Sequence, residues 1–144
     1  MNVARILATK GSKVITIRPE QTIREAIALL SQHNIGALIA MDEAGQPVGI
    51  LSERDITRAI AKNEHIFDQP LAEVMTKNVI TGVPQDDLRV VAGTMTERRF
   101  RHLPIMDKGQ LIGIISIGDV VKAQRDQYEG EIDTLHTQIL AGEA

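Results

Sequence analysis

The chain has 144 residues, 43% hydrophobic and 24% charged, with a formal net charge of −3, which suits one compact domain or two small fused ones. The negative charge and an aromatic content of 2% exclude a basic, ring-stacking surface for nucleic acid. There is no cysteine for disulfides, and no apolar run is long enough for a membrane span or a secretory signal, so a cytoplasmic protein is expected.

The first half of the chain reads as a β-α-β-β-α unit. Residues 13–18 are rich in β-branched side chains and precede a proline, which predicts a short strand. Thr22 and Glu25 form a capping-box pattern, which predicts the start of a helix. Two strands, 37–41 and 48–51, flank the turn "DEAG", and a second helix is expected from Ser52. The buried face of the first helix is expected to hold Ile23, Ala26, Ile27 and Leu30.

The second half follows the same order after a connector at residues 62–70. A strand is expected at 78–83, strands at 102–106 and 111–115 flank the turn "DKG", and a helix begins at Ser116. The intervening helix is expected to bury Leu88, Val91, Ala92 and Met95.

These two halves are copies of one unit. "VITIRP" from Val14 matches "VITGVP" from Val79 at an offset of 65, and "GQPVGILSERDITRA" from Gly45 matches "GQLIGIISIGDVVKA" from Gly109 at an offset of 64. Units of about 60 residues bury little surface alone. We therefore expect an α/β (α+β) fold in which the repeats, residues 1–64 and 65–124, pack about a pseudo-twofold axis with two related clefts between them, followed by a helical tail at 125–144.

The duplicated segments "GILSERDI" and "GIISIGDV", with "VMT" before the second repeat, resemble a tandem cystathionine β-synthase-type (CBS) domain pair, or Bateman module. The resemblance covers residues 3–123. It implies a module that binds an adenosine ligand such as AMP, ADP, ATP, NAD(H) or S-adenosylmethionine without catalysis. It also implies that the helix-start aspartate holds the ribose hydroxyls, as the acid of a dinucleotide fold does, with the serine nearby and adenine against strands of the other repeat.

Carrying the family's site over residue by residue implies two clefts. One would use Asp119, Gly118, Ser116 and Ile114, facing Lys13, Ile15, Gly36 and Ala37. The other would use Asp55, Arg54, Ser52 and Ile50, facing Asn78, Val79, Ile80, Arg101 and His102. Arg54 stands where the second copy has Gly118, so the clefts are expected to differ; Arg54 is either a phosphate ligand or a solvated first-turn arginine.

Simpler interpretations stand beside these. Ser52 and Ser116 are also ordinary helix N-caps. Arg98 and Arg99, which together with Arg101 and His102 could bind phosphates, are accounted for as cations that complement a helix C-terminus. The four histidines lack metal-ligand spacing, and the sequence contains no nucleophile elbow and no Gly-rich phosphate loop. Neither a metal site nor an enzyme is expected.

The tail carries an apolar stripe at Tyr128, Ile132, Leu135 and Ile139, spaced 4, 3 and 4. The stripe either packs on its own domain or pairs with a second chain, and a homodimer is expected. The leading hypothesis is a regulatory adenine-nucleotide sensor that signals to an unidentified effector protein. The alternatives are a structural protein–protein interaction module with unoccupied clefts and, less favoured, a small nucleotide-processing enzyme.

Overall fold

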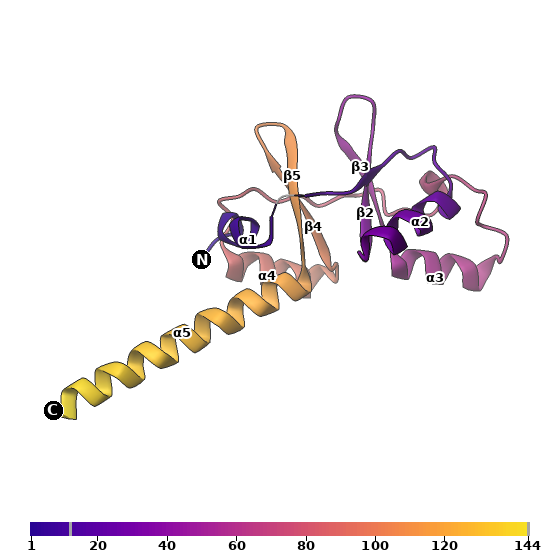
Figure 1. The fold of residues 1–144 in the computed structure, drawn as a ribbon. Helices are drawn as coiled ribbons and strands as arrows, with labels where there is room; N and C mark the ends of the chain where they lie inside the picture. The colour runs from indigo at the N-terminus through magenta and orange to yellow at the C-terminus, as the bar shows by residue number, and fades with distance from the viewer. Residues whose placement is uncertain (12, 144) are drawn as a thin grey trace.

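The computed structural model describes residues 1–11 and 13–143. Two similar lobes lie side by side, and a long helix projects away from the second lobe (Figure 1). The elements, in chain order, are α1 (Val3–Lys10), β1 (Thr16–Ile17), α2 (Ile23–His33), β2 (Ala37–Met41), β3 (Pro47–Ser52), α3 (Glu53–Lys62), the 3-10 turn η1 (Leu71–Glu73), α4 (Leu88–Arg98), β4 (His102–Asp107), β5 (Gln110–Ser116) and α5 (Ile117–Glu143).

Each lobe is built on an antiparallel hairpin, β2–β3 in the first and β4–β5 in the second. In the first lobe, β1 adds a parallel strand beside β2. The strand expected at 78–83 is wrong: only Gly82 forms a bridge, with Ile105. The reason lies in the partner strand, because Pro104 stands where β2 has Ile39 and offers no backbone N–H for a longer ladder.

Backbone conformation repeats at the same spacing as the sequence. α2 and α4 both end on a left-handed residue, Asn34 (φ 51°) and Arg99 (φ 60°). The hairpin turns both close on a glycine with positive φ, Gly45 (76°) and Gly109 (77°). The two-repeat fold with a C-terminal helix, predicted from the sequence, is confirmed.

The capping box expected at the start of α2 is only half formed. Thr22 caps the helix by accepting a hydrogen bond from the Glu25 N–H at 3.2 Å. The reciprocal bond is missing, because the Glu25 carboxylate accepts instead from the Gln21 side-chain amide at 2.6 Å. The side chain of Gln21, one position before Thr22, thus takes the place of the Thr22 backbone N–H as the donor to Glu25.

A short segment precedes each repeat and packs into the hydrophobic core of the other lobe; we call these the lead-in segments. Val3, Ile6 and Leu7 of α1 pack into the core of the second lobe, with residues of α4, β4, β5 and α5. Conversely, Leu71, Val74 and Met75 pack on the core of the first lobe, with α2, β2 and β3. Each lobe is thus completed by a segment that the chain places before the other repeat. The sequence boundaries 1–64, 65–124 and 125–144 stay a prediction.

This packing explains why both repeats carry glycine at the same position, Gly49 in the first and Gly113 in the second. A Cβ added to Gly113 of β5 would lie 2.7 Å from a Leu7 methyl, and one added to Gly49 of β3 would overlap the Met75 sulfur. Both contacts are closer than real Cβ atoms come to their neighbours. The lead-in segments can therefore lie flat on the hairpins only because these two positions carry no side chain.

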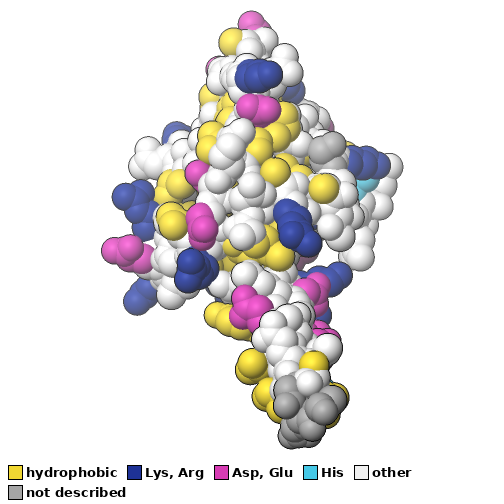
Figure 2. Space-filling model, turned by 90° about the vertical axis from the view of Figure 1, so that its left-hand side faces the viewer, with side chains coloured by type: hydrophobic (Ala, Val, Ile, Leu, Met, Phe, Trp, Pro, Cys, Tyr) yellow, Lys and Arg dark blue, Asp and Glu magenta, His cyan; other side chains and the backbone are white. Residues whose placement is uncertain are grey.

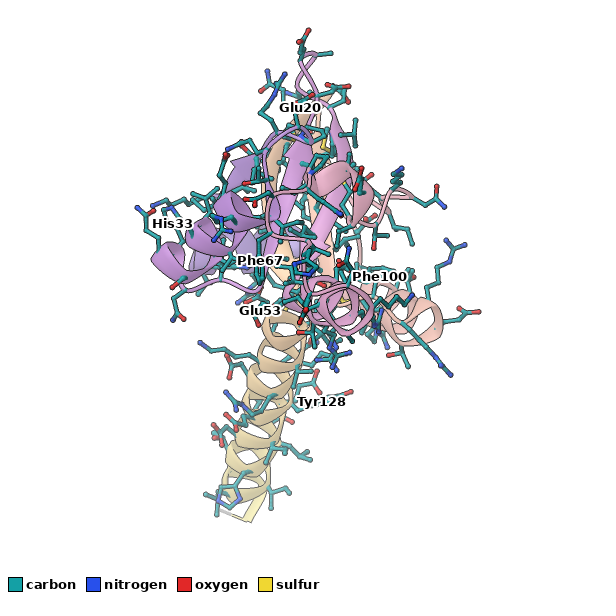
Figure 3. All side chains as sticks on the ribbon, turned by 90° about the vertical axis from the view of Figure 1, so that its right-hand side faces the viewer. Glu20, His33, Glu53, Phe67, Phe100 and Tyr128 are labelled. Atoms are coloured by element: carbon teal, nitrogen blue, oxygen red, sulfur yellow. The ribbon has the colours of Figure 1, made fainter. Side chains whose placement is uncertain are left out.

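The tail is not a separate helix, because α5 continues unbroken from Ile117 to Glu143. Its apolar stripe is exposed by 53–65%, so packing on its own domain is wrong. The projecting part of α5 carries apolar side chains on its surface (Figure 2), and Tyr128 lies on this helix (Figure 3).

Candidate functional site

Two equivalent helix starts lie at the carboxyl ends of β3 and β5. Ser52 N–H donates to Asp55 Oδ2 at 2.9 Å, and Asp55 N–H donates to Ser52 Oγ at 3.3 Å. The second copy makes the same pair of bonds between Ser116 and Asp119, at 2.8 and 3.2 Å. Among the described residues, the second carboxylate oxygen of Asp55, Oδ1, accepts no hydrogen bond. Capping therefore occupies only half of this carboxylate.

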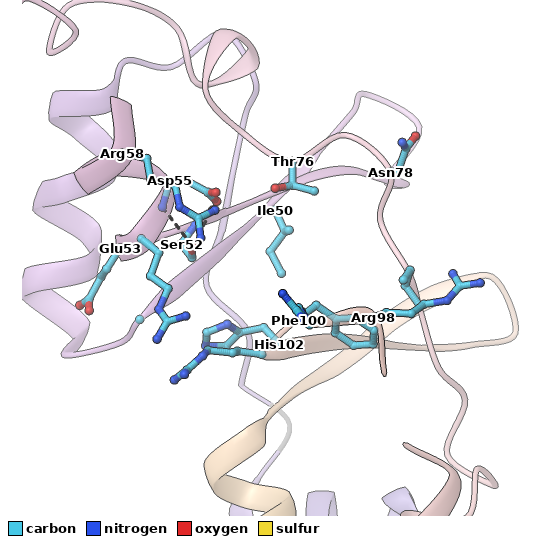
Figure 4. Close-up of a pocket in the computed structure, with 15 residues that line it drawn as sticks. Ile50, Ser52, Glu53, Asp55, Arg58, Thr76, Asn78, Arg98, Phe100 and His102 are labelled. Atoms are coloured by element: carbon cyan, nitrogen blue, oxygen red, sulfur yellow. Dashed lines mark hydrogen bonds between the residues drawn. The ribbon is translucent and has the colours of Figure 1, made fainter. Parts of the chain in front are cut away.

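A cavity of about 450 Å³ opens beside Asp55 (Figure 4). Both repeats contribute to its wall, since β3, α3 and the segment at 76–80 meet the end of α4 and the start of β4. Ile50, Ile80 and Phe100 form the apolar part of the wall, and five arginines form its basic part. The full lining is Gly36, Ile50, Ser52, Glu53, Arg54, Asp55, Arg58, Thr76, Asn78, Ile80, Arg98, Arg99, Phe100, Arg101 and His102.

This cavity, the larger of the two described here, contains eight of the nine residues predicted for the Asp55 cleft; Val79 is the exception. Asn78 and Ile80 line the cavity, while Val79 lies between them, as expected when successive side chains of an extended segment point to opposite sides. Val79 is half-buried, away from the cavity lining.

Sequence reasoning missed part of this lining: Glu53, Arg58, Thr76, Arg98, Arg99 and Phe100. Arg58 had a usable signal, because it lies four residues after Arg54 and so shares its helix face. Thr76 belongs to "VMT", and its backbone pairs with Ile50 in both directions, at 3.0 and 2.9 Å. Arg98 and Arg99 were interpreted as helix-end cations, and only the tertiary structure turns them toward this cavity.

A smaller cavity of about 260 Å³ lies on the other side of His102. It contains six of the eight residues predicted for the other cleft, namely Lys13, Ile15, Gly36, Ala37, Ile114 and Ser116. Gly118 and Asp119 are not among its lining residues, so the structure brings six of the eight together here, and the predicted ligand set stays a prediction. A Cβ at Gly118 would meet Ser116 Oγ at 3.6 Å, an ordinary contact, so the fold does not require glycine there.

Lys10 explains why Asp119 is separated from this smaller cavity. Its ammonium group donates to Asp119 Oδ2 at 2.6 Å and to the Ile114 carbonyl at 2.8 Å. Asp119 lines instead a hollow between α1 and α5. Burial alone would raise the pKa of Asp119, but the hydrogen bonds from Lys10 and Ser116 and the charge of Lys10 outweigh burial and lower that pKa.

His102 lines both cavities. Burial, together with the positive charges of Lys10 and Arg101, lowers the pKa of His102, and the opposing charges of Asp119 and Glu53 offset this only in part. His102 is therefore neutral at pH 7 and offers one ring nitrogen as a donor and the other as an acceptor.

Within residues 1–11 and 13–143, no group of three or more His, Asp or Glu side chains is arranged to hold a metal ion. In the same part of the chain, no helix combines the length and apolarity needed to cross a bilayer.

The CBS domain family model matches the chain twice, at residues 3–62 and 71–126. The chain belongs to the CBS domain family. The CBS domain-containing protein YhcV of Bacillus subtilis is 36% identical over 116 residues, covering 81% of this chain and 82% of YhcV. A CBS-domain containing protein from Agrobacterium tumefaciens has a similar crystal structure, with a TM-score of 0.83 and 40% identity over 86% of this chain and 99% of its own.

Two similar CBS structures contain adenosine compounds. The CBS domain pair of protein MJ0100, in complex with 5′-methylthioadenosine and S-adenosyl-L-methionine, matches with a TM-score of 0.79 and 30% identity, over 88% of this chain and 98% of that one. A CBS domain protein from Pyrobaculum aerophilum complexed with AMP matches with a TM-score of 0.74 and 28% identity, over 83% and 89%.

Proposed function

We propose that this CBS pair is a regulatory module that binds an adenine nucleotide in the larger cavity, with Asp55 as the ribose ligand. The observation that carries the proposal is the half-used carboxylate of Asp55 at the edge of a cavity lined by both repeats. A carboxylate oxygen with free lone pairs can accept hydrogen bonds from the vicinal hydroxyls of a ribose.

The rest of the cavity suits the other parts of a nucleotide. Ile50, Ile80 and Phe100 form an apolar wall on which a purine ring can lie. Arg54 is beside Asp55 on the first turn of α3, where a phosphate attached to the ribose also meets the positive end of the helix dipole. Asn78, Arg101 and His102 add polar groups from the opposite side.

The bound compounds in related structures support the adenosine part of this proposal. AMP in one, and 5′-methylthioadenosine with S-adenosylmethionine in the other, share adenosine and differ beyond its 5′ carbon. We propose the same recognition of adenosine here, with AMP, ADP, ATP and NAD(H) as the candidate ligands.

The smaller cavity is proposed as a second, weaker site. Asp119 is the counterpart of Asp55, but its carboxylate already accepts hydrogen bonds from Lys10 and Ser116. Both bonds reach Oδ2, and among the described residues Oδ1 of Asp119 accepts none, as in Asp55. The Lys10 ammonium beside this carboxylate competes with the ribose hydroxyls for it, and this competition lowers the affinity of the site relative to the larger cavity.

Regulation follows from the position of the larger cavity between the repeats. A ligand that contacts both lobes favours the arrangement to which it binds more tightly. We propose that an effector protein recognises this arrangement and that the chain itself performs no catalysis. The alternative is an interaction module whose clefts stay empty, and a cytoplasmic location stays a prediction from the sequence.

We also propose that the chain is a homodimer joined by a second copy of α5. The exposed stripe has a period of 3.5 residues, with Ile132 and Ile139 at one heptad position and Tyr128 and Leu135 at the other. A lone surface helix has no need of this period, whereas a two-stranded coiled coil does, and Ile combined with Leu at these positions favours two strands.

The nucleotide proposal is tested by thermal shift against AMP, ADP, ATP, NAD⁺, NADH and S-adenosylmethionine. At least one ligand should raise the melting temperature, and Asp55→Asn should weaken its binding by about 10- to 100-fold, the loss of one or two hydrogen bonds to a charged group. Asp126→Asn, an exposed aspartate on the tail, is the matched control. No stabilisation by any ligand, together with no heat of binding in calorimetry, contradicts the proposal and favours the interaction module.

A further inference from the structure

Five arginines line the larger cavity. Arg54 and Arg58 come from α3 of the first repeat, and Arg98, Arg99 and Arg101 surround the end of α4 in the second. Arg58 and Arg98 lie on different sides of the cavity in Figure 4, so the cations come from both lobes. The acidic residues of the lining are Glu53 and Asp55. The cavity therefore carries a large excess of positive charge.

This positive charge is not neutralised inside the protein. Some cations elsewhere in the chain have partners, such as Lys10 with Asp119 and Arg24 with Asp68. Among the described residues, none of the five cavity arginines forms an ion pair with a carboxylate. Asp55 Oδ2 accepts two hydrogen bonds from Ser52, and among the described residues Asp55 forms no ion pair with an arginine.

Helix electrostatics account for only some of these arginines. Arg98 and Arg99 stand at the C-terminus of α4, where cations are favourable. Arg54 stands in the first turn of α3, where the helix dipole disfavours a cation. Arg58 lies one turn later on the same face. Arg54 therefore stands where an anion is favoured, and Arg58 extends the same positive face by one turn.

The smaller cavity lacks this arrangement. Gly118 occupies the position of Arg54, and Lys122, in the position of Arg58, lines the hollow between α1 and α5 instead. One of its lysines, Lys10, is already paired with Asp119. Its volume is also lower, about 260 against 450 Å³.

We infer that the larger cavity selects its ligand by the number of phosphates and binds a nucleoside triphosphate in preference to the monophosphate. The inference rests on the proposed function, in which Asp55 holds the ribose and so directs the 5′ chain toward the arginines. Guanidinium groups bind phosphate oxygens in pairs of charge-assisted hydrogen bonds. Arg54 or Arg101 suffices for one phosphate, whereas five arginines from two lobes suit a polyphosphate chain. A triphosphate would therefore hold the lobes together more strongly than AMP.

The test is calorimetry on the full chain at one fixed salt concentration, with adenosine, AMP, ADP, ATP and inorganic tripolyphosphate. Affinity should rise by about tenfold with each phosphate added to AMP, the equivalent of one further charge-assisted contact. Arg58→Gln and Arg98→Gln should each lower ATP affinity more than AMP affinity. Arg89→Gln, an exposed arginine on α4 outside this cavity, is the control and should leave the ATP-to-AMP ratio as in the wild type.

The outcomes separate this inference from the proposed function. Equal affinities for AMP and ATP, or an ATP preference that both arginine variants retain, overturn the inference and leave adenosine binding intact. If no nucleotide binds, the proposed function and the inference that rests on it both fail. An ATP preference, together with tripolyphosphate binding that Arg58→Gln and Arg98→Gln weaken, would support the inference.

Discussion

The ammonium group of Lys10, at the end of α1, lies 2.6 Å from Asp119 Oδ2, at the start of α5. This ion pair joins the N-terminal helix α1 to the start of the C-terminal helix α5. It also makes the two repeats unequal, because Asp55, the counterpart of Asp119, has no such lysine among the described residues. The difference has consequences for stability and for binding.

Lys10→Met should destabilise the fold at neutral pH by about 0.5–1 kcal/mol, the usual contribution of a partly exposed pair. The pKa of Asp119 is lowered in the folded protein, so this contribution is present above the ordinary pKa of 3.8 and is lost as the pH falls through the lowered value. Urea unfolding of wild type and variant from pH 7 to pH 3 measures the difference. A difference that grows toward acid pH would contradict this origin.

The same substitution should strengthen ligand binding at the smaller cavity. With Lys10→Met, no ammonium group competes with the ribose hydroxyls for the Asp119 carboxylate. Calorimetry with adenosine, which carries no phosphate that could bind Lys10, should show a second site at lower ligand concentration than in the wild type. Lys62→Met, on the exposed end of α3, is the control.

His102 should titrate below its ordinary pKa of 6.5, because burial and the charges of Lys10 and Arg101 lower the pKa. Since the unfolded chain then binds more protons, stability falls as the pH drops from 6.5 toward the lowered pKa, and it changes no further below that value through this group. An anion in the larger cavity should raise the pKa of His102 again. NMR of the imidazole Hε1 with and without tripolyphosphate measures both shifts, and His102→Gln removes the signal; a pKa above 6.5 in the free protein would contradict the prediction.

Gly113→Ala should destabilise the protein by about 1–3 kcal/mol, the range found for overpacked cores. The new methyl group would lie 2.7 Å from Leu7, which is buried in the second core. Gly49→Ala should cost less, because Met75 is half-buried and its flexible side chain can move. Denaturant unfolding measures both. Gly93→Ala, in α4 with open space around it, is the control and should stabilise the chain by up to about 1 kcal/mol.

Leu135→Asp should convert the dimer to a monomer, because a carboxylate would face its own copy across the proposed coiled-coil seam. Light scattering should then give one chain mass, 15.8 kDa, in place of twice that value. Thr134→Asp, next to Leu135 but off the stripe, should remain dimeric. A dimer that survives Leu135→Asp and Ile132→Asp would place the interface elsewhere than the tail.

The repeat and the local elements could be read from the sequence because they depend on near neighbours. Ser52 and Asp55 cap α3 by bonds across three residues, and Ser116 and Asp119 do the same for α5. The hairpins follow from alternating apolar residues and a glycine turn. The strand predicted at 78–83 does not form, because Pro104 of the neighbouring strand β4 has no backbone N–H to donate. The sequence alone does not show that β4 is the neighbour.

The sequence alone determined two copies of one unit, the helix starts at Ser52 and Ser116, and most of the lining of two clefts. Only the tertiary structure decided that α1 completes the second core, that Lys10 pairs with Asp119, and that Arg98 and Arg99 line the same cavity as Asp55. The physical reason is range: hydrogen bonds within a turn and side-chain periodicity are local, whereas these contacts join segments more than 40 residues apart. Nothing in the residues near Asp119 predicts a lysine 109 positions earlier in the chain.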